Sequence, residues 1–427
     1  VMSSVVEMRQ SNSGGCRNGR SISAMRIIIL FGIVSLFGDM LYEGARSANG
    51  QYLELLGVSA TALGLVYGVG EFLGYALRLA SGYVSDRIGR QWIFIFAGYG
   101  TLIVVPMMGL TGNWQIIIVL ILLERIGKGL RSPPKDTVLS QVAEDGKAGM
   151  GMSFGIQEAL DQIGAFSGPL IFSLAFYLTG KQGIAEYQYG YVLLSIAFVL
   201  LMLALLFVFR RYRGYETDMP SPPVRTGKED LTRQFWVFTL FASLTTLGLV
   251  NFSLIGYHLK AQCILPDSQI VLLYSLAMIV DAAVALCIGK LYDKLKERSG
   301  AKSGGVSVLA MVPIVTAAIP FLSLGTTAIG AIAGMVLFGV VMGAQETVMR
   351  SAIADITPFR KRGTAYGIFY TAYGLSFLIG STMMGFMYDR FDLIYIGISV
   401  LVIEAVALVV FMRMRSGLKE DAIGSAV

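Results

Sequence analysis

Apolar stretches about as long as a membrane is thick recur along the whole chain. One of them, residues 189–210, contains no charged residue before Arg210. A helix needs roughly 20 mostly apolar residues to cross the hydrocarbon core of a bilayer. A window of about 19 residues predicts twelve transmembrane helices, at residues 24–47, 60–84, 92–110, 114–136, 149–179, 189–210, 234–259, 268–291, 305–324, 328–354, 364–388 and 392–413.

Composition supports an all-α integral membrane protein whose solvent is the lipid bilayer. Only 15% of the residues are charged and 55% are hydrophobic, whereas soluble domains contain about 25% charged residues. The basic residues gather on one side of the predicted helices, at Arg9 to Arg26, Arg210 to Arg233, Lys290 to Lys302 and Arg360 to Arg362. The positive-inside rule then predicts a multi-pass protein of the plasma membrane with both termini in the cytoplasm. This bias accounts for the net charge of +6, and no nucleic-acid partner is expected.

A polar segment with Pro220, Pro222 and Pro223 divides the predicted helices into two sets of six. The predicted organisation is an N-terminal tail (1–23), a six-helix bundle (24–210), a cytoplasmic linker (211–233), a second six-helix bundle (234–414) and a C-terminal tail (415–427). The sequence also repeats itself, because Gly82-x-x-x-Asp86-Arg87 matches Gly289-x-x-x-Asp293-Lys294. Such repeats are expected of two pseudo-symmetric bundles related by an axis along the membrane normal.

Three motifs resemble signatures of the major facilitator superfamily, and the resemblance covers residues 24 to 414. The first is Gly82-x-x-x-Asp86-Arg87-x-Gly89-Arg90, in which Gln91 replaces a final basic residue. The second is Arg125-x-x-Lys128-Gly129, with Lys128 in place of the usual glutamine. The third, Gly164-x-x-x-Gly168-Pro169, is similar to the first half of a motif of drug:proton antiporters, without its trailing glycines.

The resemblance implies roles for these residues, each with a simpler alternative. Asp86 would hold the start of the eleventh helix near Gly363, and Asp293 would repeat this contact against the fifth. Alternatively, Arg87 and Arg90 only set topology while Gly82 and Gly89 only form a turn. Gly164, Gly168 and Pro169 would form a hinge of an antiporter, or they serve only close helix packing.

Charged residues inside predicted helices are costly in lipid, so they are expected to face the bundle interior. The candidates for proton coupling or substrate binding are Asp39, Glu43, Arg125, Glu158, Asp161, Asp281, Glu346 and Arg350. Asp39 and Glu43 share one helix face, where two carboxylates favour proton uptake. A static network of Asp39, Glu43 and Arg125 is the alternative. Pro133 and Pro134 are expected to end or kink the fourth helix and to place Arg131 and Asp136 at an inner gate.

The predicted function is secondary active transport by alternating access, in the form of proton-coupled export of small amphipathic or hydrophobic compounds. A proton-coupled symporter or facilitator for a sugar, organic acid or peptide is an alternative, with Arg125 or Arg350 holding an anionic group. A non-transporting receptor is a third. Hydrolase, zinc-protease and nucleotide-binding motifs are absent, and one histidine and three scattered cysteines predict no enzyme, cofactor or metal. The chain is expected to act as a monomer.

Overall fold

The computed structural model describes residues 13–145, 150–212, 231–299, 305–357 and 362–424, and these ranges contain helices and no strand. In chain order the elements are α2 (Ser13–Leu55), α3 (Ala60–Ile88), α4 (Gln91–Gly100), η1 (Thr101–Ile103), α5 (Val104–Met107), η2 (Met108–Leu110), α6 (Trp114–Asp145), α7 (Met150–Thr179), α8 (Ile184–Tyr212), α9 (Arg233–Leu247), α10 (Phe252–Ala261), α11 (Asp267–Ser299), η3 (Ser307–Ala310), α13 (Met311–Ser323), α14 (Ala328–Ile356), α15 (Arg362–Arg390) and α16 (Leu393–Gly424).

These elements form the predicted succession of membrane spans. Nine segments of the described chain are long and apolar enough to cross a membrane, among them α4 to η2 as one span and α9 with α10 as another. The other three spans are α6, which carries several charges, the shorter η3 and α13, and the polar α15. The prediction of an all-helical membrane fold is confirmed.

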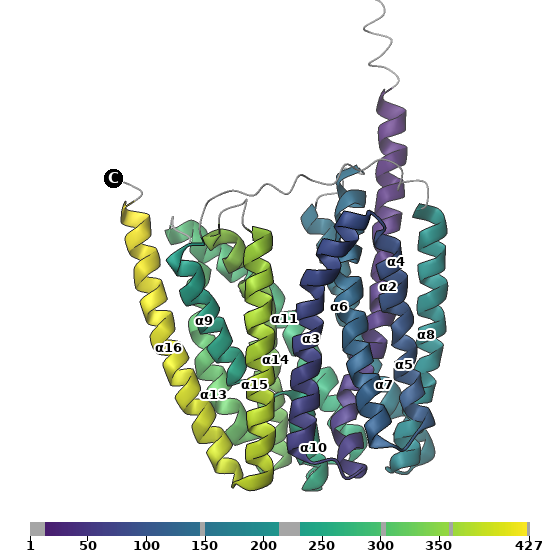
Figure 1. Cartoon of the computed structure of the whole chain (residues 1–427), viewed down its shortest axis with the longest axis vertical. Coiled ribbons are helices and arrows are strands. Elements are labelled where there is room, and N and C mark those ends of the chain that lie inside the picture. The colour runs from purple at the N-terminus through teal and green to yellow at the C-terminus, as the bar shows by residue number, and fades with distance from the viewer. Residues whose placement is uncertain (1–12, 146–149, 213–230, 300–304, 358–361, 425–427) are drawn as a thin grey trace, which may run out of the picture.

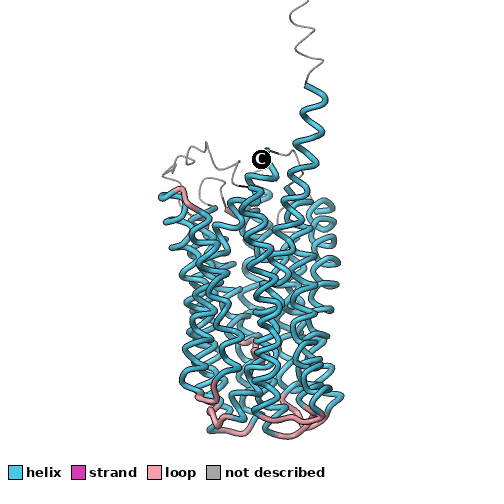
Figure 2. The backbone as a smooth tube through the Cα atoms, turned by 90° about the vertical axis from the view of Figure 1, so that its right-hand side faces the viewer, coloured by secondary structure: helices cyan, strands magenta, loops and turns pink. Residues whose placement is uncertain are grey.

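The spans form two bundles that lie side by side (Figure 1). In the first, α2 packs against α7 and α8, and α6 packs against α3 and α4; in the second, α14 packs against α11 and α13, and α9 against α15 and α16. The bundles meet along the pairs α3 with α15, α7 with α11 and α2 with α10. The axes of the long helices are roughly aligned with one another, and short loops join them at the end opposite the chain termini (Figure 2). We call this the distal end, and the other the terminal end. The exact domain limits stay a prediction.

Glycine positions let backbones approach closely, both within and between the bundles. A Cβ atom on Gly164 would overlap with the carbonyl of Leu36, and Gly168 faces Gly44, so α2 and α7 touch along their backbones. Between the bundles, Gly64 lies against the carbonyl of Ser381 and Gly50 against that of Ser253. These close contacts between bundles lie towards the distal end.

The fourth predicted span does not end at its prolines. Helix α6 continues through Pro133 and Pro134 to Asp145. A proline at position 133 cannot donate to the carbonyl of Gly129, and the Ser81 hydroxyl of α3 donates to that carbonyl instead, over 2.8 Å. A neighbouring serine thus satisfies the freed backbone group, as membrane helices with proline require.

Two other helix limits differ from the prediction. Helix α2 runs on to Leu55 instead of ending near residue 47, which places Arg46 inside the bundle. The seventh span is broken, because α9 ends at Leu247 and α10 begins only at Phe252, where the Asn251 side chain accepts a hydrogen bond from the Leu254 amide over 2.9 Å.

Candidate functional site

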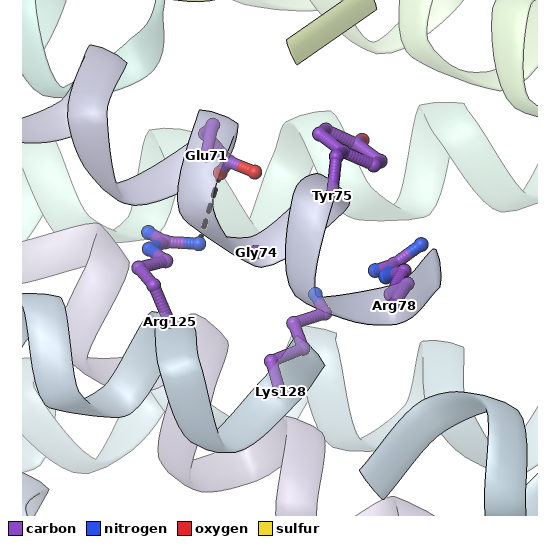
Figure 3. Close-up of a pocket in the computed structure, with 6 residues that line it drawn as sticks. All are labelled: Glu71, Gly74, Tyr75, Arg78, Arg125 and Lys128. Atoms are coloured by element: carbon purple, nitrogen blue, oxygen red, sulfur yellow. Dashed lines mark hydrogen bonds and ion pairs between the residues drawn. The ribbon is translucent and has the colours of Figure 1, made fainter. Parts of the chain in front are cut away.

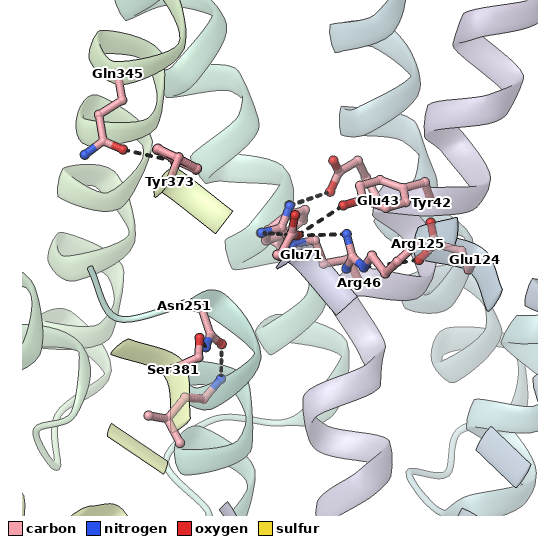
Figure 4. Close-up of polar contacts among 12 residues, drawn as sticks. Tyr42, Glu43, Arg46, Glu71, Glu124, Arg125, Asn251, Gln345, Tyr373 and Ser381 are labelled. Atoms are coloured by element: carbon pink, nitrogen blue, oxygen red, sulfur yellow. Dashed lines mark hydrogen bonds and ion pairs between the residues drawn. The ribbon is translucent and has the colours of Figure 1, made fainter. Parts of the chain in front are cut away.

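The centre of the first bundle contains a network of charged side chains from α2, α3 and α6 (Figure 4). Arg125 of α6 donates to Glu71 of α3 over 2.9 Å, and its side chain is only 2% exposed. Its Nε also lies 3.4 Å from Glu124. Buried guanidinium groups require such partners, since an unpaired buried charge costs several kcal/mol. Arg125 is therefore paired with Glu71 and Glu124, and among the described residues it forms no direct ion pair with Asp39 or Glu43.

The network extends to the second bundle through α2. Arg46 lies 3.8 Å from both Glu43 and Glu71. Glu43 accepts a hydrogen bond from the Tyr274 hydroxyl of α11. This hydrogen bond joins the two halves of the molecule at the level of the charged network.

Aromatic rings cover the cations of this network. The guanidinium of Arg125 lies 4.4 Å from the ring centre of Tyr42, and the ammonium of Lys128 lies 3.5 Å from the same centre. Arg78 lies 4.9 Å from the ring centre of Tyr75. A small pocket beside these side chains is lined by Glu71, Gly74, Tyr75, Arg78, Arg125 and Lys128 (Figure 3). Its charged lining is mostly positive.

A second polar cluster lies further along α2, nearer the terminal end. Lys135 donates to Ser35 over 2.8 Å, and Ser35 donates to Gln157 over 3.1 Å. Asp39 interacts electrostatically with Asp161 and Lys128. Oδ1 of Asp161 has no hydrogen-bond partner among the described residues. The structure thus brings predicted site residues of α2 and α7 together, with lysines of α6 between them.

Three more predicted acids lie where the two bundles meet. Asp281 of α11 is 3% exposed, and its Oδ1 has no hydrogen-bond partner in the described ranges. It interacts electrostatically with Glu158 of α7 and Glu346 of α14. Glu158 and Glu346 are themselves exposed. This acidic group contains one side chain from the first bundle and two from the second.

A wall of aromatic rings lies next to this acidic group. The ring of Tyr75 on α3 stacks on that of Tyr370 on α15, with centres 5.6 Å apart, and meets the edge of Tyr373 at 5.2 Å. Tyr373 donates to Gln345 over 3.5 Å (Figure 4) and interacts electrostatically with Glu346. Acidic and aromatic side chains therefore share the space between α3, α14 and α15.

The structure describes some of the predicted gating residues and leaves others outside the described part. Gly89 ends α3 in the left-handed conformation with φ 68°, which explains the glycine at that turn. Arg87 and Arg90 are exposed, and Gly82 lies beside Pro133. The side chains of Asp86 and Arg350, and the surroundings of Gly363, lie outside the described part of the structure.

The remaining gate candidates do not gather at one place. Asp293 is exposed and forms no hydrogen bond or ion pair with the described residues. Arg131 is buried within the first bundle, with its guanidinium 4.8 Å from the ring centre of Tyr99. Asp136 is exposed. Because α6 continues past its prolines, Arg131 packs against α4 instead of reaching the end of a helix.

Pro169 lies inside the continuous helix α7, one residue after Gly168. Gly164 and Gly168 serve the close contact of α7 with α2 described above. This packing matches the simpler alternative for the third motif. A hinge at Pro169 stays a prediction.

Asp389 of α15 was not among the predicted site residues. Its carboxylate accepts from the amides of Ala60 and Thr61 over 3.1 and 2.7 Å, at the first turn of α3 in the other bundle. A carboxylate is favourable at the positive N-terminal end of a helix. The sequence signal was the spacing Gly385-x-x-x-Asp389-Arg390, which repeats that of the first motif.

Arg46, next to the predicted end of the first helix at residue 47, was not among the predicted site residues. Its spacing of three residues from Glu43 was the available signal, since such residues are neighbours on a helix surface. Glu404 of α16 was overlooked within an apolar stretch. In the described ranges, no group of three or more histidine, cysteine or acidic side chains could hold a metal ion.

Comparison with known proteins agrees with this architecture. The family model of the Major Facilitator Superfamily matches residues 27–344 and 306–424. The chain belongs to the Major Facilitator Superfamily. It is therefore a multi-pass membrane transporter of small molecules and not an enzyme.

Related superfamily members span nearly the whole chain. An uncharacterised protein of Mycobacterium tuberculosis is 34% identical over 400 residues, which cover 92% of this chain and 93% of that protein. An uncharacterised MFS-type transporter of Methanocaldococcus jannaschii is 29% identical over 386 residues, covering 87% and 90% of the two chains.

Solved transporter structures share the fold. The nucleoside transporter NupG, in a mutant form, has a TM-score of 0.70 at 15% identity, covering 91% of this chain and 99% of that chain. An inward-facing bacterial homologue of the human lysosomal transporter Spinster also has a TM-score of 0.70, at 14% identity, covering 93% and 98%. At such identities the likeness concerns the fold alone.

Proposed function

We propose that this superfamily member is a proton-coupled antiporter that exports small amphipathic compounds, with cationic compounds as the preferred class. It works by alternating access, in which the two bundles rock about a site between them. The proposed site is the acidic group of Glu158, Asp281 and Glu346 together with the aromatic wall of Tyr75 and Tyr373.

The observation that carries this proposal is the state of Asp281. Its carboxyl group is buried and one oxygen has no hydrogen-bond partner among the described residues. A bare carboxylate in such a place costs several kcal/mol. The group is stabilised either by a proton or by the positive charge of a bound substrate. Since the two compete for one carboxyl group, substrate binding displaces the proton, which is the exchange that antiport requires.

The aromatic wall supports the choice of substrate. Tyrosine faces attract cations, and rings also remove apolar surface from water. Tyr75 interacts electrostatically with Glu346, so a substrate between the bundles can contact the aromatic rings and the acidic side chains together. A flat or bulky organic cation fits both features at once.

The pocket of Figure 3 favours a second candidate, the transport of a small organic anion together with protons. Its lining contains Arg78, Arg125 and Lys128 against a single acid, Glu71. However, Arg125 is already paired with Glu71 over 2.9 Å. Arg78 and Lys128 would therefore supply the attraction for an anion.

The test uses purified protein in sealed proteoliposomes with a preset proton gradient and a pH-sensitive dye inside. Lipophilic cations such as tetraphenylphosphonium, and small organic anions such as benzoate, are added in turn. We expect the cations to dissipate the gradient and Asp281→Asn to abolish this effect. Asp392→Asn, an exposed acid outside the acidic group, serves as the matched control and should behave like the wild type.

Dissipation by anions alone, abolished by Lys128→Gln, would overturn the antiport proposal and favour the second candidate. Equal dissipation by the wild type and Asp281→Asn would remove Asp281 from the coupling mechanism. Cation transport without any proton movement would leave an uncoupled carrier of the same substrates.

A further inference from the structure

Glu404 is a buried acid away from the acidic group between the bundles. It lies on α16, is 2% exposed, and neither carboxylate oxygen has a hydrogen-bond partner among the described residues. Its Oε1 lies so close to Gly248 that a Cβ atom there would overlap with it. Gly248 is the residue that ends α9 at the break in the seventh span. The carboxyl group therefore faces a helix break inside the membrane region.

Within the described ranges, the surroundings of Glu404 offer no positive charge. Helices α9, α13 and α15 and the turn η3 pack against α16. Helix α13 and η3 contain no titratable residue, and Arg233, the only titratable residue of α9, stands at the other end of that helix. No titratable side chain of α15, and neither Arg413 nor Arg415 of α16, interacts electrostatically with Glu404.

The helix break makes a negative charge there still less favourable. The C-terminal end of a helix carries a partial negative charge and leaves up to four carbonyl groups without an intrahelical donor. A carboxylate beside the end of α9 is repelled, whereas a carboxylic acid can donate its proton to such a carbonyl. Discontinuous membrane helices are known places for coupling protons and ions.

We propose that Glu404 is a second proton-binding site, located between α16 and the break of α9 and α10. A proton suits the site because it neutralises the carboxylate without needing further ligands, while the described residues contain no cluster of acidic, histidine or cysteine side chains for a metal ion. With the proton bound, the neutral acid does not repel the carbonyl end of α9. Loss of the proton frees the break, because the carboxylate then repels the carbonyl end of α9.

The break between α9 and α10 lies next to the contact between the bundles, so a change of angle at the break moves residues of that contact. On its far side, Asn251 donates to Ser381 of α15 over 2.8 Å (Figure 4), while Ser253 and Gly256 lie against Gly50 and Gln51 of α2. A change of angle at Gly248 therefore shifts α10 against α2. Proton release from Glu404 loosens the distal contact between the bundles, and this link to transport rests on the proposed function, whereas the site itself does not.

The experiment is a pH titration of the protonated carboxyl stretch by infrared difference spectroscopy on the full chain in lipid. We expect the wild-type protein to lose carboxyl bands as the pH rises, and Glu404→Gln to lack one of these bands from the start. Glu297→Gln, an exposed acid on α11, should keep it. Sodium added at constant pH should leave the band unchanged.

Each outcome decides a separate claim. An identical titration in the wild type and Glu404→Gln overturns the proton site, as does a Glu404 band that never titrates or that sodium removes. If the band titrates but the wild type moves no protons in proteoliposomes, the site stands and the antiport proposal fails. If the band titrates and Glu404→Gln still exchanges protons with the wild-type pH dependence, the link between Glu404 and the distal contact is wrong.

Discussion

The two halves of this transporter share a six-helix architecture but treat charge inside the membrane in different ways. In the first half, Arg46 and Arg125 are paired with Glu43, Glu71 and Glu124. In the second half, Asp281 and Glu404 have carboxylate oxygens without hydrogen-bond partners among the described residues, and no described cation interacts with either, whereas Asp161 of the first half, which also has such an oxygen, interacts with Lys135. Paired charges stabilise one another and hold helices in place. An acid without a partner must obtain one from outside, in the form of a proton or a substrate.

The largest expected effect comes from breaking the paired network of the first half. Glu71→Gln leaves the buried guanidinium of Arg125 without its 2.9 Å partner. Removing one member of a buried pair costs about 3–5 kcal/mol. We expect that loss in the free energy of unfolding, measured by denaturant titration in detergent micelles.

Two further variants sharpen this prediction. Glu158→Gln removes an exposed acid and should change the free energy of unfolding by no more than about 0.5 kcal/mol. The double variant Glu71→Gln with Arg125→Gln should recover part of the loss, because no charge then remains unpaired. Equal losses for Glu71→Gln and Glu158→Gln would mean that pairing with Arg125 does not determine the loss of stability.

A smaller effect is expected at the hydrogen bond between the halves. Tyr274→Phe removes the donor to Glu43 while the ring can keep its packing. Hydrogen bonds to charged groups contribute about 1.5–3 kcal/mol. We expect a loss near the lower limit, because Glu43 retains Arg46. A double-mutant cycle with Glu43→Gln measures the coupling, and a coupling energy of zero would contradict the contact.

The contact of Asp389 with α3 should contribute less. Asp389→Asn keeps the shape of the cap but removes the charge at the helix end, which costs about 1 kcal/mol or less. We expect the amides of Ala60 and Thr61 to exchange hydrogen up to about fivefold faster, as measured by mass spectrometry. Amides near Gly180, at another distal loop, should exchange as in the wild type and provide the internal control.

The smallest effect on stability is expected for Asp281→Asn in the second half. No described partner of Oδ1 loses a hydrogen bond, so the free energy of unfolding should change by less than about 1 kcal/mol. The same variant should lose gradient-driven transport. A large loss of stability would show that Asp281 is a structural residue like Glu71, and the contrast between the halves would disappear.

The sequence was sufficient to predict the fold, because apolar length and basic flanks reflect the bilayer directly. It also pointed to Arg125 and Asp281 as charges facing the interior. It did not reveal that Arg125 pairs with Glu71, since these residues are far apart in the chain and meet only through the packing of α3 with α6.

Helix ends caused the main errors of prediction. The fourth helix was predicted to end at residue 136, but α6 continues to Asp145, and the Gly129 carbonyl freed by Pro133 accepts from Ser81 of another helix, which no local pattern reveals. Helix α2 likewise extends to Leu55, past its predicted end at residue 47. Both errors concern boundaries that neighbouring helices decide.

The glycine contact of α2 with α7 has a consequence for how the transporter moves. Where the backbones touch at Gly44 and Gly168, no side chain lies between the two helices to slide or repack. We therefore expect α2 and α7 to move together as one rigid body, so that the distance between Asp39 and Asp161 stays constant throughout the transport cycle. Paired spectroscopic labels on these two helices would report a constant distance. This distance would be the internal reference for distances measured from the first bundle to labels on the second.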